Sequence, residues 1–271
     1  MWSQTPVPIP TPHPPPQTMT ERPPHEDPPH ISFVVTGFGP FRGVQDNPTS
    51  ALARDLPSYL ASARPDLAAR TSTLIIETSA DDVLSSLAEI FDGLEARATG
   101  AVVLLHLGVD YRGKCFKVER CAYNDATFRV PDERDYQPVA EVCVDSHGHG
   151  HRFSTSLPVD ALVRRMRSDP IKGAGGDTAG GFTVNLVQPS SDPGRFVCNF
   201  TYAQSLNRAE IFNGTMSGED GITPRTAPTV HSLFLHVPPI TVVPMERQMH
   251  FVVGLMEAIG AQLDKDRARR R

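Results

Sequence analysis

The sequence lacks long apolar runs, has few cysteines and carries no excess of basic charge. A membrane-spanning helix needs roughly 20 apolar residues, and the chain has no such run and no apolar signal-peptide segment near its start. Its net charge is −5, and no basic stripe with interleaved aromatic residues suggests nucleic-acid binding. Four cysteines among 271 residues, with no Cys-x-x-Cys pair, indicate neither a disulfide scaffold nor a zinc knuckle. We therefore expect a cytoplasmic protein with free thiols, without a membrane or nucleic-acid partner.

Both ends of the chain differ in composition from its centre. Residues 1–30 contain 11 of the 26 prolines. Proline fixes φ and lacks a backbone N–H, so a disordered Pro-rich tail is predicted here, either a plain extension or a docking segment for a proline-reading domain. The short basic tail 266–271 is predicted to be a solvated helix end, with a nuclear signal or an anionic partner as the alternative.

Residues 31–265 alternate apolar runs with helical patterns and are predicted to form a single domain. The predicted strands are ISFVVTGF, TSTLIIETS, GAVVLLHLGV, FTVNLVQ and SLFLHVPP. Helical patterns occur in NPTSALARDL, SADDVLSSLAEIFDGLEARA, DALVRRMRSD and ERQMHFVVGLMEAIGAQL. This alternation predicts an α/β fold, a three-layer α/β/α sandwich around a mostly parallel twisted sheet. Gly-rich or polar stretches near 172–181 and 207–232 are predicted to be surface loop insertions.

Cys198, in the stretch PGRFVCNFTYAQSL, carries the most distinctive chemistry. A turn precedes it and a helical pattern follows, which places the thiol at a helix N-terminus. Oriented backbone N–H groups there favour a thiolate. The position fits a nucleophile, and it equally fits a buried, inert cysteine.

Two further residues could complete a site with Cys198. His236 follows three apolar residues in LFLHVPP, so it stands at the carboxyl end of a predicted strand, where sites gather in open α/β sheets. Glu119 lies in the alternating run KVERCAYN and faces away from Val118. Cysteine, histidine and an acid are the nucleophile, base and orienting group of thiol acyl transfer. Their spacing alone leaves open a core histidine and a solvated charge.

Four segments resemble signature segments of the pyroglutamyl-peptidase I family, the C15 cysteine peptidases, and occur in that family's order. They are VVTGFGPFRGVQDNP, VERCAYNDATFRVPD, PGRFVCNFTYAQSL and SLFLHVPP. The family patterns they resemble include TGFxPFGGxxxNPS, AGxxxCN and FxHxP. Four motifs in order are far more specific than any one of them, and the resemblance spans about residues 31 to 263.

The resemblance implies an enzyme, a site and a substrate class. The implied activity is that of a cysteine omega peptidase, which removes an N-terminal pyroglutamyl residue from peptides by thiol acyl transfer, without metal or other cofactor. The implied catalytic residues are Glu119, Cys198 and His236. The implied substrate-binding residues are Phe38 and Phe41 beside the lactam ring, Val130, Phe196 and Val197 lining its pocket, Asn47 holding the site loops, and Arg129 near the reacting carbonyl.

The chain departs from the family pattern at two places near the implied site. FRG replaces FGG in the opening motif, so Arg42 stands at the mouth of the site. After the central strand, GVDYRG replaces GQAGG, and Val109 replaces a side chain that can form hydrogen bonds. Either change could alter substrate preference.

Two other functions and one other site fit the sequence less well. One is a catalytically weak relative that binds pyroglutamyl peptides, which retention of cysteine, histidine and glutamate argues against. Another is a thiol amidase that cleaves other acyl amides. The run HGHGHR contains His147, His149 and His151, whose alternation could bind a metal, although the glycines favour a polar loop.

Overall fold

The computed structural model describes residues 31–41, 43–44, 46–95, 100–168, 171–172, 178–179, 186–215 and 228–270. The Pro-rich segment 1–30 and Arg42 lie outside the described residues. Within the described part of the chain, no helix has the length and apolar composition needed to cross a membrane.

A six-stranded sheet with the order β2-β1-β3-β10-β4-β9 forms the centre of the fold. Its strands are β1 (Ile31–Phe38), β2 (Thr71–Ile76), β3 (Ala101–Val109), β4 (Phe116–Glu119), β9 (Val187–Ser190) and β10 (Thr229–Val237). The first four strands in the sheet order are parallel, β4 runs antiparallel to β10, and β9 is parallel to β4. Two further antiparallel pairs are small: β5 (Cys121–Tyr123) pairs with β6 (Arg152–Ser154), and β7 (Ile171–Lys172) pairs with β8 (Thr178–Ala179).

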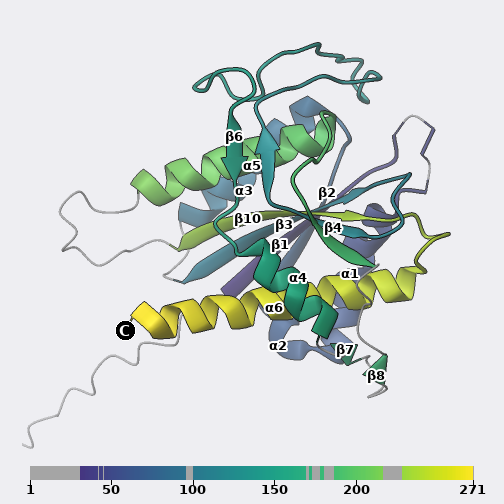
Figure 1. Ribbon diagram of the computed structural model, residues 1–271, viewed down its shortest axis with the longest axis vertical. Coiled ribbons are helices and arrows are strands. Elements are labelled where there is room, and N and C mark those ends of the chain that lie inside the picture. The colour runs from purple at the N-terminus through teal and green to yellow at the C-terminus, as the bar shows by residue number, and fades with distance from the viewer. Residues whose placement is uncertain are drawn as a thin grey trace, which may run out of the picture.

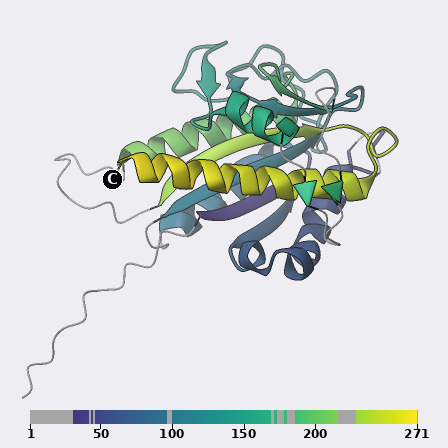
Figure 2. The ribbon, with the colours of Figure 1, turned by 60° about the horizontal axis from the view of Figure 1, so that its bottom comes forward.

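Helices cover both faces of the sheet (Figures 1 and 2). One face carries α1 (Pro48–Ala63), α2 (Pro65–Ala68), α4 (Val159–Ser168) and α6 (Met245–Arg270), and the other carries α3 (Ala80–Glu95) and α5 (Val197–Thr215). Alternate strand residues supply the two cores, as with Val35 under the first group and Val34 under the second. The predicted three-layer α/β/α sandwich with a mostly parallel sheet is confirmed.

The first helix begins where its sequence signals predict. Asn47 is the N-cap, and its Oδ1 accepts a hydrogen bond from the Thr49 backbone N–H at 3.1 Å. Pro48 follows as the first helical residue, where its missing N–H has no consequence. Leu52, Leu56 and Leu60 then bury one face of α1 against the sheet.

The structure corrects two predicted boundaries and refines a third. Helix α5 continues to Thr215 and β10 begins at Thr229, so the predicted loop insertion 207–232 is wrong at both ends, and its middle lies outside the described residues. The stretch near 172–181 contains the short strand pair β7–β8. Helix α6 extends to Arg270, so the predicted basic tail is largely its last turns.

Buried aromatic packing explains the longer α5. Phe212 is buried and meets Phe91 of α3 edge-to-face, with ring centroids 5.9 Å apart. Ala209 and Phe212 belong to this core cluster, and Asn213 is bonded to the backbone of Val230 on β10 at 2.8 and 2.9 Å.

Gly37 lies where β1 passes closest to α1, and a side chain has no room there. An added Cβ would lie 2.1 Å from the carbonyl oxygen of Thr49 and 3.1 Å from the Cβ of Ala53. Since backbone cannot move aside as a flexible side chain can, we expect Gly37→Ala to lower the free energy of unfolding by about 3 kcal/mol, measured by urea denaturation. Gly93→Ala on α3 is the control: its Cβ meets nothing within 4 Å, so helix propensity should raise stability by about 0.5–1 kcal/mol. Equal urea midpoints for both variants would contradict this account.

Candidate active site

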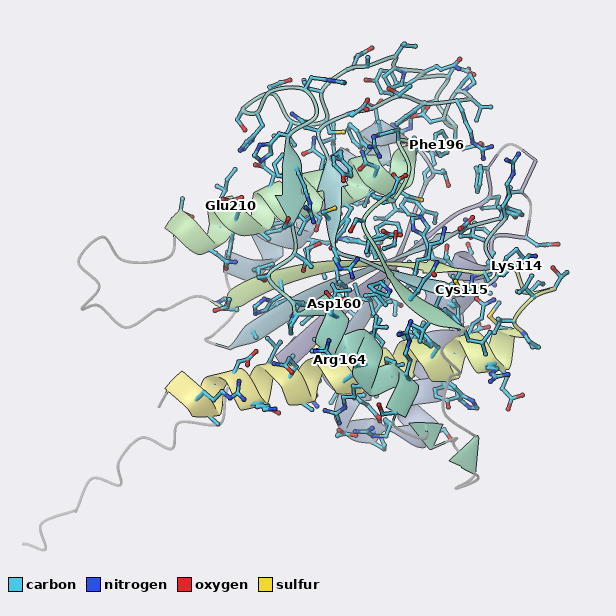
Figure 3. The ribbon with its side chains drawn as sticks, in the orientation of Figure 1. Lys114, Cys115, Asp160, Arg164, Phe196 and Glu210 are labelled. Atoms are coloured by element: carbon cyan, nitrogen blue, oxygen red, sulfur yellow. The ribbon has the colours of Figure 1, made fainter. Side chains whose placement is uncertain are left out.

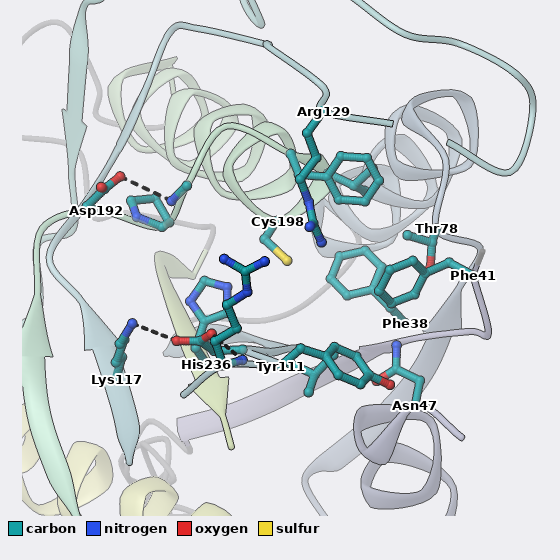
Figure 4. Close-up of a pocket in the computed structure, with 17 residues that line it drawn as sticks. Phe38, Phe41, Asn47, Thr78, Tyr111, Lys117, Arg129, Asp192, Cys198 and His236 are labelled. Carbon is teal, nitrogen blue, oxygen red and sulfur yellow. Dashed lines mark hydrogen bonds and ion pairs between the residues drawn. The ribbon is translucent and has the colours of Figure 1, made fainter. Parts of the chain in front are cut away.

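Cys198 is the second residue of α5 and opens onto a cavity of about 360 Å³. The chain turns just before it at Gly194, whose φ of 78° lies in the left-handed region that favours glycine. The turn is closed by a 3.2 Å hydrogen bond from the Gly194 N–H to Oδ1 of Asp192. Helix α5 therefore starts beside the strand ends of the sheet, and the thiol of Cys198 is half-buried in the cavity wall (Figure 4).

His236 and Glu119 lie on the neighbouring strands β10 and β4. The antiparallel register of β10 and β4 pairs Phe234 with Glu119 and His236 with Lys117. Nδ1 of His236 lies 2.8 Å from Oε1 of Glu119, and the imidazole also interacts with the thiol of Cys198, which helps to raise the imidazole's pKa. The structure thus brings the predicted cysteine, histidine and glutamate into one chain of contacts, which the spacing alone left open.

The electrostatics of this chain favour a charged imidazole. Burial by itself lowers the pKa of His236, but the hydrogen bonds and charges of Cys198 and Glu119 outweigh burial and raise the pKa to about 10. The Glu119 side chain is fully buried, and its Oε2 has no hydrogen-bond partner among the described residues. A buried carboxylate is costly unless paired, so the hydrogen bond to His236 is central to its stability.

Two sets of buried hydrogen bonds hold α5 against the strands that carry the site. The Tyr202 hydroxyl donates to the carbonyl oxygen of Glu119 at 3.0 Å. Further along the helix, Ser205 contacts Nε2 of His106 on β3 at 2.8 Å, and the other ring nitrogen contacts Thr36 at 2.8 Å. Burial lowers the pKa of His106 to about 3, so it serves as a neutral tie between helix and sheet.

Aromatic rings line one side of the cavity beyond Cys198. Phe38 ends β1, and Phe41 follows it after a short turn. The Phe41 ring lies 6.2 Å from that of Phe196 and 6.3 Å from that of Tyr111. Figure 4 shows Phe38 and Phe41 together on this side, with Asn47 beneath them. These rings form the walls of a slot for a flat, apolar group.

Asn47 fastens the base of this aromatic slot. Its Nδ2 donates to the carbonyl oxygen of Gly39 at 3.0 Å, while its Oδ1 holds Thr49 at the start of α1. The same side chain therefore caps a helix and fixes the turn that carries Phe38 and Phe41. This position agrees with the loop-holding role that the resemblance implies.

Charged side chains line the opposite side of the cavity, and sequence reasoning missed most of them. The ε-ammonium of Lys117 lies 2.6 Å from Oδ2 of Asp110. Asp192 also lies on this side, and Arg129 reaches in toward Cys198 (Figure 4). Arg112 lines the cavity too, with its backbone N–H bonded to Asp110. Lys117 could have been found, because it stands two residues before Glu119 in the same strand and so shares its face.

The remaining predicted residues divide between the cavity and its surroundings. Val197 is fully buried and Phe196 half-buried, and both line the cavity at the start of α5, where Figure 3 labels Phe196. Val109 also lines it. Val130, predicted to line the pocket, does not belong to the lining; it is 36% exposed.

The side chains of the histidine run HGHGHR contact neighbouring protein groups. His147 and His151 lie with ring centroids 4.4 Å apart, and both contact Phe153. His149 instead approaches Asp125, at 3.4 Å. Across the described residues, no group of three or more histidine, cysteine, aspartate or glutamate side chains is arranged to hold a metal ion.

Comparisons with known proteins match the chain to one family. The family model described as pyroglutamyl peptidase matches residues 31–192. The chain belongs to the pyroglutamyl peptidase family. A pyrrolidone-carboxylate peptidase of Klebsiella pneumoniae (strain 342) is 32% identical over 154 residues, which cover 57% of this chain and 66% of that protein. A pyrrolidone-carboxylate peptidase of Streptomyces coelicolor is also 32% identical, over 158 residues, again covering 57% of this chain and 66% of that protein.

Solved structures extend the match to nearly the whole fold. Pyrrolidone carboxyl peptidase from Thermus thermophilus aligns with a TM-score of 0.58 and 25% identity, covering 83% of this chain and 99% of that one. The enzyme from Thermococcus litoralis aligns with a TM-score of 0.62 and 19% identity, a likeness of fold alone, over 87% and 96% of the two chains.

The stretch that the family model matches contains only part of the site. The matched stretch 31–192 contains Glu119 and stops before Cys198 and His236. The chain spans 66% of the length of each of these two curated relatives. The association of the nucleophile and the base with Glu119 is therefore carried by the contacts in the structure.

Proposed function

We propose that this chain is a cysteine peptidase that removes an N-terminal pyroglutamyl residue from peptides by thiol acyl transfer. The observation that carries the proposal is the Cys198–His236–Glu119 chain of contacts beside an aromatic slot. A pyroglutamyl group is a neutral five-membered lactam, which suits flat apolar walls. Among the described residues, the lining offers no uncommitted carboxylate for the α-ammonium of an ordinary N-terminus, because Asp110 pairs with Lys117 and Asp192 with Arg195.

The first chemical step uses the thiolate of Cys198. With the lactam ring between Phe38 and Phe41, the substrate carbonyl lies over the thiolate. Sulfur attacks the carbonyl carbon, a C–S bond forms, and the carbonyl electron pair moves onto oxygen. Backbone N–H groups in the first turn of α5 have no intrahelical partner and stabilise this oxyanion, with the guanidinium of Arg129 close by.

His236 supplies and removes protons in the later steps. As the tetrahedral intermediate collapses, the C–N bond breaks and the imidazolium of His236 protonates the departing amine. Water then attacks the thioester and His236 accepts its proton. The C–S bond breaks, pyroglutamate leaves, and the thiolate of Cys198 and the imidazolium of His236 are restored. Glu119 keeps the imidazole oriented and favours its charged form. We place this chemistry in the cytoplasm, since Cys198 must remain a free thiol.

A matched pair of fluorogenic amides tests the proposal. One carries a pyroglutamyl group, and the other a prolyl group, whose ring has the same size but bears a charged nitrogen and no lactam carbonyl. Under reducing conditions, we expect the chain to release the amine from the pyroglutamyl amide at least about 100-fold faster in kcat/KM. A comparable rate on both amides would favour a general thiol amidase, and no turnover by the folded, reduced protein would overturn the proposal.

A further inference from the structure

The turn after β3 builds a fixed platform beside the catalytic histidine. Asp110 donates its N–H to the carbonyl oxygen of Val237 at 2.9 Å, and its own carbonyl accepts from Gly113 at 2.9 Å. Its Oδ1 accepts from the backbone N–H of Arg112 at 3.2 Å, while Oδ2 binds Lys117. The backbone of Arg112 is therefore held by the Asp110 carboxylate, and Asp110 is itself bonded to the strand that carries His236.

Glycine is required to close this turn. A Cβ at Gly113 would lie 2.8 Å from both the carboxyl carbon and Oδ2 of Asp110, so a side chain there would disturb the carboxylate. The turn thus depends on Asp110 and Gly113, the first and last residues of DYRG. This sequence stands in place of the glycines and alanine of the family pattern GQAGG. Its two central side chains, Tyr111 and Arg112, both line the cavity.

The two side chains serve different sides of the cavity. Tyr111 extends the aromatic side through its edge contact with Phe41. Arg112 belongs with the charged residues beside His236, whose sheet neighbours are Gly108 on β3 and Lys117 on β4. Because His236 protonates the departing amine, residues on this side face the peptide that leaves.

Most charges on the leaving side are already paired. Asp110 pairs with Lys117, and Asp192 pairs with Arg195 at 2.9 Å. Among the described residues, the guanidinium of Arg112 has no hydrogen-bond or ion-pair partner. An unpaired guanidinium on a cavity wall is a ready binding group for a carboxylate, which it can hold through two parallel N–H···O bonds.

We propose that Arg112 makes this peptidase select substrates with a carboxylate on the residue that follows pyroglutamate. The proposal rests on the proposed function, because it assigns the leaving side of the same site. The carboxylate could belong to an acidic side chain at that residue, or to the chain terminus of a pyroglutamyl dipeptide. Both sources offer the same planar anion to the guanidinium.

Isosteric substrates isolate the charge. The first pair is pyroglutamyl-glutamyl-alanine amide against pyroglutamyl-glutaminyl-alanine amide, which differ only in one carboxylate. The second pair is pyroglutamyl-alanine against pyroglutamyl-alanine amide, which tests the terminal carboxylate. We expect the acidic member of at least one pair to have a kcat/KM about 5- to 10-fold higher, and the ratio to shrink as salt is raised from about 0.02 M to about 0.5 M.

Variants assign the preference to Arg112. In Arg112→Gln the acidic-to-neutral ratio should fall to about 1, and in Arg112→Glu it should fall below 1. Arg164→Gln is the matched control: Arg164 is exposed on α4, outside the cavity lining (Figure 3), and should keep the wild-type ratio. Because each ratio is taken within one protein preparation, partial loss of folded enzyme cancels.

The possible results distinguish failure of the Arg112 proposal from failure of the peptidase proposal. A wild-type ratio near 1 in both substrate pairs, with good turnover of the neutral members, would overturn the role of Arg112 and leave the peptidase proposal intact. A wild-type preference that survives in Arg112→Gln would also overturn it. Absence of turnover on all four substrates would defeat the peptidase proposal, and the inference with it.

Discussion

Replacing Cys198 by alanine is expected to reduce turnover of a pyroglutamyl amide by a factor of about 10⁴ or more. Sγ of Cys198 is the only protein atom that forms a covalent bond with the substrate, so neither His236 nor the backbone N–H groups can substitute for it. The remaining aromatic slot should still hold the lactam, and a labelled pyroglutamyl peptide should bind the variant with little change in Kd. Initial rates and fluorescence anisotropy measure the two properties separately.

Cys115→Ala is the matched control for this loss. Cys115 is partly exposed, lies outside the cavity lining, and has a pKa raised by burial. Its replacement should leave kcat/KM within about twofold of wild type. If Cys198→Ala kept a tenth of wild-type activity, or if Cys115→Ala lost it, the assignment of the nucleophile would be wrong.

Glu119→Gln is expected to lower kcat by a factor of about 10² to 10⁴, a smaller loss than that of the thiol. The amide keeps the size of the carboxylate and can still contact Nδ1 of His236, but it cannot stabilise an imidazolium. The exposed Glu89→Gln on α3 is a matched control and should have wild-type activity. Equal losses in both variants would contradict the role of Glu119.

The pH dependence of Glu119→Gln should change in a defined direction. In the wild type, Cys198 and Glu119 together raise the pKa of His236 to about 10, so the imidazolium persists well above neutral pH. Without the carboxylate, the opposing effect of burial gains weight and this pKa falls. The alkaline limb of kcat/KM should therefore move to lower pH, which a profile from about pH 5 to about pH 10 measures. A limb that stays in place would show that Glu119 does not support the charge of His236.

Local sequence signals were sufficient for most of the fold. The cap at Asn47, with Pro48 after it, fixed the start of α1, and the apolar run before Val109 marked a central strand. The extent of α5 could not be predicted in the same way. Its last turns look polar, and they are held by the contact between Phe212 and Phe91, which lie on different helices.

The sequence predicted which residues form the site, and the structure shows how they contact one another. A helix-start cysteine, a strand-end histidine and an alternating glutamate pointed to thiol chemistry, but only the register of β10 on β4 brings Glu119 to His236. The pairing in the charged wall could not be predicted, because Asp110 follows β3 and Lys117 lies on β4, and only the sheet order brings the two together. Val130 was predicted from the resemblance alone, and it is exposed outside the cavity lining.

Reaction with a pyroglutamyl chloromethyl ketone tests the central claim most directly. The thiolate displaces chloride from the methylene carbon, a C–S bond forms, and peptide mass spectrometry then identifies the labelled residue. The account predicts one label per chain, on Cys198, formed in step with loss of amidase activity and slowed by a pyroglutamyl peptide. Labelling of Cys115, Cys121 or Cys143 instead, or full activity after complete labelling of Cys198, would contradict it.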